Sequence, residues 1–371
     1  MPESQGHPNA ATICAFNEIQ GGIVMRTIYL IRHARPDIPA GKLQCIGITD
    51  IPLGTQGELQ AVVLGEYMKD IPLQAVFCSD LSRAIQTASA ISPTPTIIPE
   101  LREMNAGDWD GLFFDEIRQR WPEIYEKRGV DPNFPIPGAE DPEHGQHRFR
   151  NALETILQQT EGDIAIVAHC TIMQSFLSFV LGTDVNQCRQ YKLDYTSITT
   201  VRYADGRFTL ENMNLRPRVP LTDDLCEKLL TTALAPVEHC REVCEKADVL
   251  TRALADAGLE LDSTVTHFGA LLHDIAKKEP DHPTTGAQWL RDLGWEAVAE
   301  AVRTHHDPDN LEINEQNVVY LADKLPVEER FARSIVTCTT HEARNAHARR
   351  LLTARQLKLK INALCGKEIV P

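Results

Sequence analysis

The chain has 371 residues, which is enough for two or three domains. Its 43% hydrophobic and 24% charged residues exclude a disordered chain, and no apolar run approaches the roughly 20 residues of a membrane helix. The formal net charge of −15 argues against nucleic acid and lipid surfaces as partners.

The N-terminal segment 1–25 lacks the basic and apolar regions of a secretory signal peptide, so we expect it to be a flexible leader. Ten cysteines are scattered along the chain without a Cys-x-x-Cys pair. This distribution is typical of reduced thiols, and we therefore expect a cytoplasmic protein.

Strand-like and helix-like runs alternate over residues 26–213. Short apolar runs predict strands at 27–31, 75–79, 163–168, 196–203 and 207–213. Helices are expected at about 53–69 (after a short loop), 81–91, 145–160 and 171–181, with a Pro- and Gly-rich loop at 129–142. This alternation predicts an α/β domain with a mostly parallel sheet.

The pattern changes at residues 214–221, a Pro-containing stretch that we interpret as a linker. Beyond it, β-like runs are nearly absent, and residues 222–371 predict an all-α domain. The expected helices are at about 222–233, 236–257, 262–277, 284–293, 295–304, 314–325 and 328–363.

Chemically active side chains follow the predicted strands of the first domain. Arg32-His33 and His169 directly follow predicted strands, and Arg83 begins a helix after a third strand. Glu103 lies between Arg83 and His169 in the chain. The carboxyl ends of strands meet at one edge of an open α/β sheet. A neutral imidazole can attack phosphorus, guanidinium groups bind phosphoryl oxygens, and a carboxyl group can protonate the leaving oxygen and then activate water. This set predicts metal-free phosphoryl transfer.

Several motifs resemble those of the histidine phosphatase (phosphoglycerate mutase-like) superfamily over about residues 26–213. They are Arg32-His33-Ala34, Gly47–Leu53, Ser79–Thr87, Leu101–Gly111, Pro137–Glu140 and His169. The resemblance implies a three-layer α/β fold with a mostly parallel sheet. It also implies that His33 is the nucleophile and Glu103 the proton donor, and that Arg32, Arg83 and His169 form the phosphate pocket. The flanking sequence is most similar to small phosphatases that include α-ribazole-phosphate phosphatases, which favours hydrolysis over phosphate exchange.

Two residues depart from this family pattern. Ala34 and Cys170 stand where the family usually has glycine after each catalytic histidine. Glycine permits backbone angles and close approaches that a Cβ restricts. We expect catalysis to survive with altered substrate fit, and we favour a packed, inert Cys170 thiol over a redox-sensitive one.

Histidine and aspartate recur through the second domain, most clearly as His273-Asp274 near the end of an apolar helix. Imidazole with carboxylate suits Mn, Fe, Co or Zn, and carboxylate oxygen also suits Mg. Six such side chains can hold two ions, with Asp274 bridging them. A metal-bound water becomes a nucleophile toward phosphoesters.

This pattern resembles the HD-domain phosphohydrolases over about residues 222–371. Segments 282–287, 302–305 and 319–324 resemble a dinuclear subgroup that hydrolyses dinucleoside tetraphosphates, and HD domains fused to molybdenum-cofactor-type nucleotidyltransferases are also similar. The resemblance implies a phosphate contact for Lys277. The metal ligands that it implies are His239, His273, Asp274, His282, His305 and Asp323. His306 is the rival of His305, which we prefer because the subgroup's Ile-Arg-x-His pattern aligns there.

The leading hypothesis is a bifunctional phosphohydrolase. The first domain would be a phosphomonoesterase for a small phosphorylated metabolite and would need no cofactor. The second would use divalent metal, such as Fe or Mn, in a mononuclear or dinuclear site to hydrolyse nucleotide-type phosphoesters. One alternative is a phosphatase regulated by a nucleotide-binding HD module, and a weaker alternative is a phosphomutase. The oligomeric state stays open.

Overall fold

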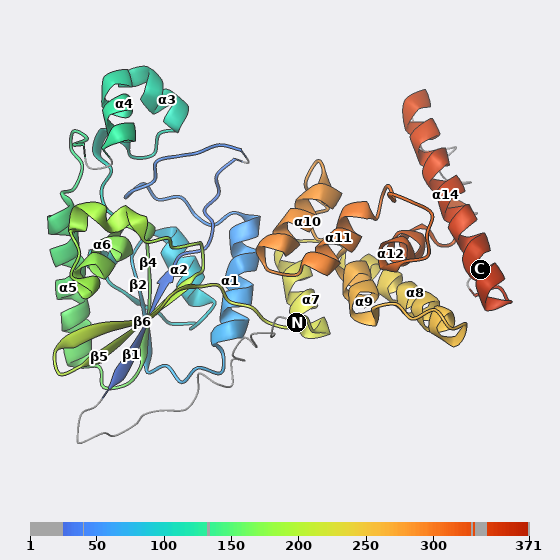
Figure 1. Cartoon of the computed structure of the whole chain (residues 1–371), viewed down its shortest axis with the longest axis horizontal. Coiled ribbons are helices and arrows are strands. Elements are labelled where there is room, and N and C mark those ends of the chain that lie inside the picture. The colour runs from blue at the N-terminus through green and yellow to red at the C-terminus, as the bar shows by residue number, and fades with distance from the viewer. Residues whose placement is uncertain (1–24, 40, 132–133, 328, 331–339, 370–371) are drawn as a thin grey trace, which may run out of the picture. The chain divides into compact units, whose positions relative to one another are not determined.

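The computed structural model describes residues 25–39, 41–131, 134–327, 329–330 and 340–369. All of the expected flexible leader except Met25 lies outside these residues. The chain divides between Val219 and Pro220 into two compact units (Figure 1), which are described separately below. None of the helices in the described ranges combines the length and the hydropathy that crossing a membrane requires.

The first unit contains a six-stranded sheet with the order β3-β2-β4-β1-β5-β6. The strands are β1 (Arg26–Arg32), β2 (Ala75–Cys78), β3 (Thr96–Ile97), β4 (Ile164–Ala168), β5 (Ile198–Ala204) and β6 (Arg207–Leu215). The first four run parallel, and β5 and β6 add an antiparallel edge. The two-residue strand β3 was not predicted, because it is too short to carry a periodic pattern.

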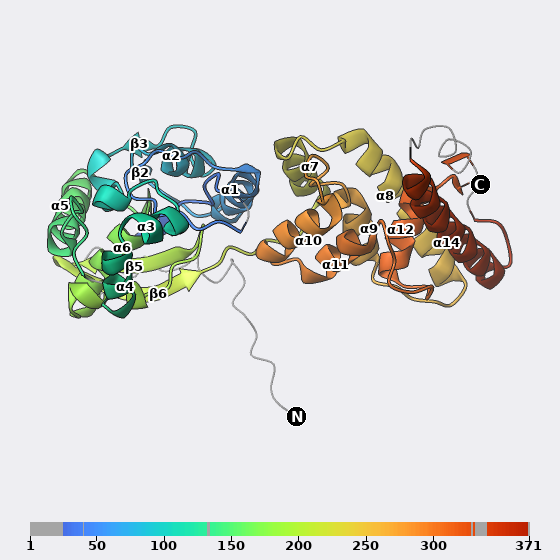
Figure 2. The ribbon, with the colours of Figure 1, turned by 90° about the horizontal axis from the view of Figure 1, so that it is seen from above.

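Helices cover both faces of this sheet (Figures 1 and 2). The covering helices are α1 (Thr55–Met68), α2 (Ser82–Ser89), α5 (Pro142–Gln159) and α6 (Cys170–Leu181). Alternate residues of β1 point to opposite faces: Ile28 and Leu30 pack in the core with α5 and α6, and Tyr29 and Ile31 pack in the core with α1 and α2. The predicted three-layer, mostly parallel α/β fold is therefore confirmed.

Two short helices, α3 (Phe114–Arg120) and α4 (Pro122–Val130), were not predicted and lie beside each other away from the two covering layers (Figure 1). Each is too short to show a clear apolar stripe. The predicted loop 129–142 is correspondingly shorter, because α4 continues to Val130 and α5 begins at Pro142. The described part of the unit also contains short 3-10 segments at Pro99–Leu101, Gly107–Trp109 and Val185–Gln190.

The described residues of the second unit form helices joined by turns and loops, without a strand among them, so the all-α prediction is confirmed for them. Its helices are α7 (Asp223–Thr232), α8 (Val237–Asp256), α9 (Ser263–Leu272), α10 (His282–Asp292), α11 (Glu296–Thr304), α12 (Glu315–Lys324) and α14 (His341–Cys365). Two predicted helices are wrong in extent. The helix expected at 262–277 ends at Leu272, where the chain enters a series of turns. The helix expected at 328–363 falls partly on residues 328 and 331–339, which lie outside the described ranges. It is not continuous, because Thr340 has an extended backbone and caps a new helix with its side chain.

An ion-pair network joins α7, α8 and α9. The His267 ring lies between two carboxylates, with Nε2 2.9 Å from Asp223 and Nδ1 3.0 Å from Asp248. Burial alone would lower the pKa of His267, but hydrogen bonds to the two aspartates outweigh burial and raise it above 6.5. The protonated ring is therefore stabilised in the folded state.

This network should make stability depend on pH. Because the folded pKa of His267 is raised, its contribution is fully present below the unfolded value of about 6.5 and is lost as pH rises through the folded value. The melting temperature of the His267→Gln variant should fall below that of the wild type at about pH 5.5, and this gap should close toward about pH 8.5. When Asp248→Asn is present in both proteins, the difference in melting temperature caused by His267→Gln should be smaller. A difference that stays constant with pH would contradict the assignment.

Candidate functional site

Strand register places the two histidines of the first unit side by side. Arg32 of β1 pairs with Ala168 of the parallel strand β4, so the residues that follow them, His33 and His169, leave the sheet together. The His33 backbone N–H donates to the Ala168 carbonyl at 3.0 Å, and the two ring centroids lie 4.9 Å apart. The prediction that strand ends bring these residues together is therefore observed in the geometry.

The His33 ring is held in one tautomer. Its Nδ1 lies 2.7 Å from the Ala34 carbonyl oxygen, which can only accept, so Nδ1 carries the proton and the lone pair is on Nε2. Burial lowers the pKa of His33 well below 6.5, and the positive charges of Arg83 and Arg32 lower it further. The ring is therefore neutral at physiological pH, which is the form that a nucleophile requires.

His169 is fully buried and lies behind His33. Its Nε2 is 2.6 Å from the Ser79 hydroxyl at the end of β2, whereas its Nδ1 has no partner among the described residues. Burial lowers the pKa of His169 well below 6.5, and the positive charges of Arg83 and Arg32 lower it further. Ser79 is a supporting residue that the sequence alone did not single out.

Arg32 and Arg83 are held by backbone carbonyls rather than by carboxylates. Arg32 donates to the Leu193 carbonyl at 2.7 Å, and Arg83 donates to the carbonyls of Thr49 and Gly47 at 2.8 and 2.7 Å. The Nε atoms of both arginines are buried without a partner in the described structure. Both guanidinium groups therefore keep positive charge that an anionic group can neutralise.

The loop that holds Arg83 is itself anchored by Asp110. Its carboxylate accepts hydrogen bonds from the backbone N–H groups of Gly47, Ile48 and Thr49 at 2.7–3.2 Å. Burial alone would raise the pKa of Asp110, but the hydrogen bonds from Thr49 and the backbone lower it. A Cβ at position 47 would collide with this carboxylate, so the close approach requires glycine.

The Glu103 side chain lies at the start of α6. Its two carboxylate oxygens accept from the backbone N–H groups of Met104, Thr171 and Ile172 at 2.8–2.9 Å. These bonds fix Glu103, which is buried, at the wall of the cavity described next.

A cavity of about 380 Å³ opens in front of these groups. Arg32, His33, Arg83 and Glu103 all line it, whereas His169 does not. Tyr195, which the sequence did not identify, also lines the cavity, and the Arg32 guanidinium carbon lies 3.9 Å from its ring centroid. No motif distinguished this tyrosine, because its contact with Arg32 forms only in the folded chain.

The two departures from glycine are accommodated locally. Ala34 is fully buried against Leu53 and Ala61, so its methyl group fills a small apolar pocket. Cys170 begins α6 and lines the cavity, and burial raises the pKa of its thiol to about 11. A thiol with such a pKa stays protonated near neutral pH and is a poor nucleophile.

In the second unit, histidine and aspartate side chains from five helices and their ends converge on one buried aspartate, Asp274. Its Oδ1 lies 3.2 Å from His282 Nε2 and 3.6 Å from His305 Nε2. Its Oδ2 lies 3.5 Å from His273 Nε2 and 3.9 Å from His239 Nε2. The two oxygens of one carboxylate therefore face two separate pairs of imidazoles.

Asp323 belongs to the Oδ2 side of this cluster. Its Oδ1 lies 3.4 Å from His239 Nε2 and 3.8 Å from His273 Nε2. Burial alone would raise the pKa of Asp274, but the nearby imidazoles of His273 and His305 and a hydrogen bond from Lys277 hold it well below its usual range. All six predicted ligands are thus close together in the structure.

The cluster has the features of a site for a metal ion. The Nε2 atoms of His273, His282 and His305 are buried without a partner among the described residues. The Nδ1 atoms of His273 and His305 lie 2.7 and 2.6 Å from the carbonyls of Ala270 and Val302, which leaves the lone pairs on Nε2. Such carbonyl contacts orient metal-binding imidazoles, so these residues fit a divalent cation.

Basic residues surround the carboxylates of this cluster. Lys277 Nζ lies 3.0 Å from Asp274 Oδ2, and Lys324, which is buried and was not predicted, pairs with Asp323. His306 also lies at the cluster: nitrogens of His282, His305 and His306 lie within 4.8 Å of one another. The structure thus brings both rival histidines to the site.

The structure therefore contains two groups of functional side chains. The group in the first unit is suited to phosphoryl transfer, and the group in the second unit is suited to holding a metal ion. Buried histidines and guanidinium groups around a cavity at the end of an α/β sheet are typical of enzymes that act on phosphate esters. Comparison with known proteins identifies the families. A model described as the histidine phosphatase superfamily (branch 1) matches residues 28–216, and a model described as the HD domain matches residues 237–327.

Individual relatives each match about half of this chain. The uncharacterized phosphatase PhoE of Bacillus subtilis is 27% identical over 197 residues, covering 52% of this chain and 95% of that protein. The probable phosphoglycerate mutase GpmB of Erwinia tasmaniensis is 30% identical over 184 residues, covering 48% and 85%. The structure of a putative α-ribazole-5'-P phosphatase from Escherichia coli has 24% identity and a TM-score of 0.47, covering 52% and 97%.

The chain belongs to the histidine phosphatase superfamily and carries an HD domain as well. Both are phosphohydrolase families, so the protein is a hydrolase that acts on phosphate esters. HD domains are typically metal-dependent, in agreement with the histidine–aspartate groups of the second unit.

Proposed function

We propose that residues 26–213 form a phosphomonoesterase domain and residues 222–371 an HD hydrolase domain. The linker 214–221 joins them, although its first two residues are the end of strand β6. The observation that supports the phosphomonoesterase activity is the neutral, buried His33 ring, whose Nε2 carries a free lone pair. This ring lines the same cavity as two arginines that backbone carbonyls hold in place. A small phosphorylated metabolite is the substrate, as for the α-ribazole-phosphate phosphatases that the sequence resembles.

In this proposal the first step transfers the phosphoryl group to His33. Nε2 of His33 forms a bond to phosphorus while the ester P–O bond breaks, and Glu103 in its protonated form gives the leaving oxygen a proton. Arg32 and Arg83 neutralise the phosphoryl oxygens, and His169 supports the pocket from behind His33. Water then attacks phosphorus and passes a proton to Glu103 as the P–N bond breaks, which regenerates both residues.

For the second domain we propose a metal centre that hydrolyses nucleotide-type phosphoesters. The residues that would hold the metal are His239, His273, Asp274, His282, His305 and Asp323. Asp274 would be shared between two positions, each of which would take Fe, Mn or a similar divalent ion. Bound metal supplies Lewis-acid chemistry and lowers the pKa of coordinated water. Lys277 lies at the edge of this cluster, where its ammonium group can contact a substrate phosphate.

A chelator should separate the two activities of the full chain. We expect hydrolysis of p-nitrophenyl phosphate to survive strong chelation, because its side chains need no metal. Turnover of diadenosine tetraphosphate and other nucleotides should fall to background and return when Mn or Fe is restored. If the chelator removed both activities, the metal-free mechanism of the first domain would be wrong.

Two further outcomes of this experiment would correct the proposal. Metal and nucleotide binding without nucleotide turnover would make the HD domain a regulatory module of the phosphatase. Transfer of phosphate within or between metabolites, instead of release of inorganic phosphate, would make the first domain a mutase. Both are measured in the same assays by analysis of products.

A further inference from the structure

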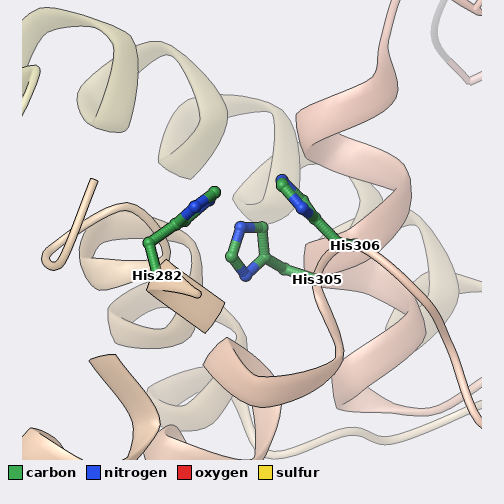
Figure 3. Close-up of side chains that lie close together, drawn as sticks. All are labelled: His282, His305 and His306. Carbon is green, nitrogen blue, oxygen red and sulfur yellow. The ribbon is translucent and has the colours of Figure 1, made fainter. Parts of the chain in front are cut away.

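Two consecutive histidines, His305 and His306, reach the histidine–aspartate cluster around Asp274 from the end of α11. Figure 3 shows the rings of His305 and His306 beside His282, the first residue of α10. The His306 ring centroid lies 4.3 Å from that of His305 and 4.6 Å from that of His282. His305 and His306 were alternatives in the sequence, but the folded chain places them together.

The end of the helix makes this arrangement possible. Consecutive residues inside a helix point about 100° apart, so they rarely serve one site. Here α11 ends at Thr304 and the chain bends through His305 and His306. His305 is bound to the Val302 carbonyl through Nδ1, whereas His306 has no hydrogen bond to any described residue.

The two sides of Asp274 are unequal without His306. On the Oδ2 side lie His239, His273 and a second carboxylate, that of Asp323. On the Oδ1 side, the imidazoles that pair with this oxygen among the described residues are those of His282 and His305. The first position thus has four protein ligands, and the second has three.

We infer that His306 is a direct ligand of the second metal position, together with His282, His305 and Asp274 Oδ1. This inference rests on the proposed metal centre. It makes the centre asymmetric, with two imidazoles and two carboxylates at one position and three imidazoles and one shared carboxylate at the other. Imidazole favours Zn, Co, Ni and Fe, whereas carboxylate-rich sites also suit Mg and Mn. The second position therefore selects the ions that bind nitrogen well.

Cobalt binding to the full chain tests this inference without an activity assay. The protein is stripped of metal, and Co²⁺ binding is followed by equilibrium dialysis and by visible absorption. We expect the wild type to bind two ions. His306→Ala should keep the first ion and bind the second about tenfold to a hundredfold more weakly. Removing a residue that only supports a metal ligand typically lowers metal affinity by this factor, so removing a direct ligand should lower it at least as much.

Controls and alternative outcomes keep the inference separate from the metal proposal. His306→Gln, which preserves more of the side-chain volume, should weaken the second ion as His306→Ala does, and His347→Ala should change neither constant. Two ions bound to both His306 variants with wild-type constants would overturn the inference and leave the metal centre intact. A single ion in the wild type would also overturn it, and a wild type that binds no divalent ion would overturn both.

Discussion

Replacing His33 with alanine should abolish phosphomonoesterase activity while the protein stays folded. We expect kcat/KM for p-nitrophenyl phosphate to fall by ~10³-fold or more, which corresponds to at least about 4 kcal/mol of lost transition-state stabilisation. The reason is that, in the proposed mechanism, the nucleophile is the Nε2 lone pair of His33, a residue that lines the cavity. Acid-labile phosphohistidine should be trapped in the wild type by rapid quench and should be absent from the variant.

The second unit provides an internal control for folding. Metal-dependent stabilisation of the HD domain should be the same in His33→Ala as in the wild type. His33→Gln, which leaves a smaller void in the buried site, should be equally inactive. His147→Ala changes an exposed histidine of α5 and should retain full activity. Wild-type turnover in either His33 variant would eliminate the phosphohistidine mechanism.

Asp274→Ala should remove the stabilisation of the HD domain by metal. Mn or Fe at about 100 times its Kd stabilises a folded site by about 2.7 kcal/mol, which raises Tm by about 5–10 °C for a domain of this size. Because the two oxygens of Asp274 face different imidazole pairs, its loss affects both positions. Calorimetry of the stripped full chain with and without metal measures the shift.

The size of the metal-induced shift, rather than the absolute Tm, is the result that matters, because removing a buried carboxylate also changes the metal-free protein. Asp274→Asn should lose the shift as well, since an amide lacks the negative charge. Asp256→Ala, at an exposed position at the end of α8, should keep it. A full metal shift in Asp274→Ala would rule out its bridging role.

The fold was largely predictable, because its main elements carry strong patterns. The apolar run of β1 and that of β4 are both fully buried between helical layers, so their positions were clear. The helix at α9 was predicted too long because apolar residues continue past it. Ile275 and Ala276 are buried in the turns that directly follow His273 and Asp274. Periodicity cannot distinguish such turns from a helix.

The candidate sites were predictable only as sets of residue types in order. Family resemblance suggested the residues, and strand register explains why His33 and His169 meet. Residues whose part depends on tertiary contact were missed. Tyr195 stacks on Arg32, and Lys324 pairs with Asp323 inside the second unit. His306 could not be placed, because its direction depends on where α11 ends.

The anchoring of the loop by Asp110 bears on how this protein could acquire new substrates. The carboxylate holds positions 47–49, and those positions hold Arg83. The stretch that precedes them supplies Ile38 and Gln44 to the cavity wall, yet it lies outside the anchored turn. Evolution can therefore change that stretch, and with it this part of the cavity wall, while the anchored turn keeps Arg83 in place.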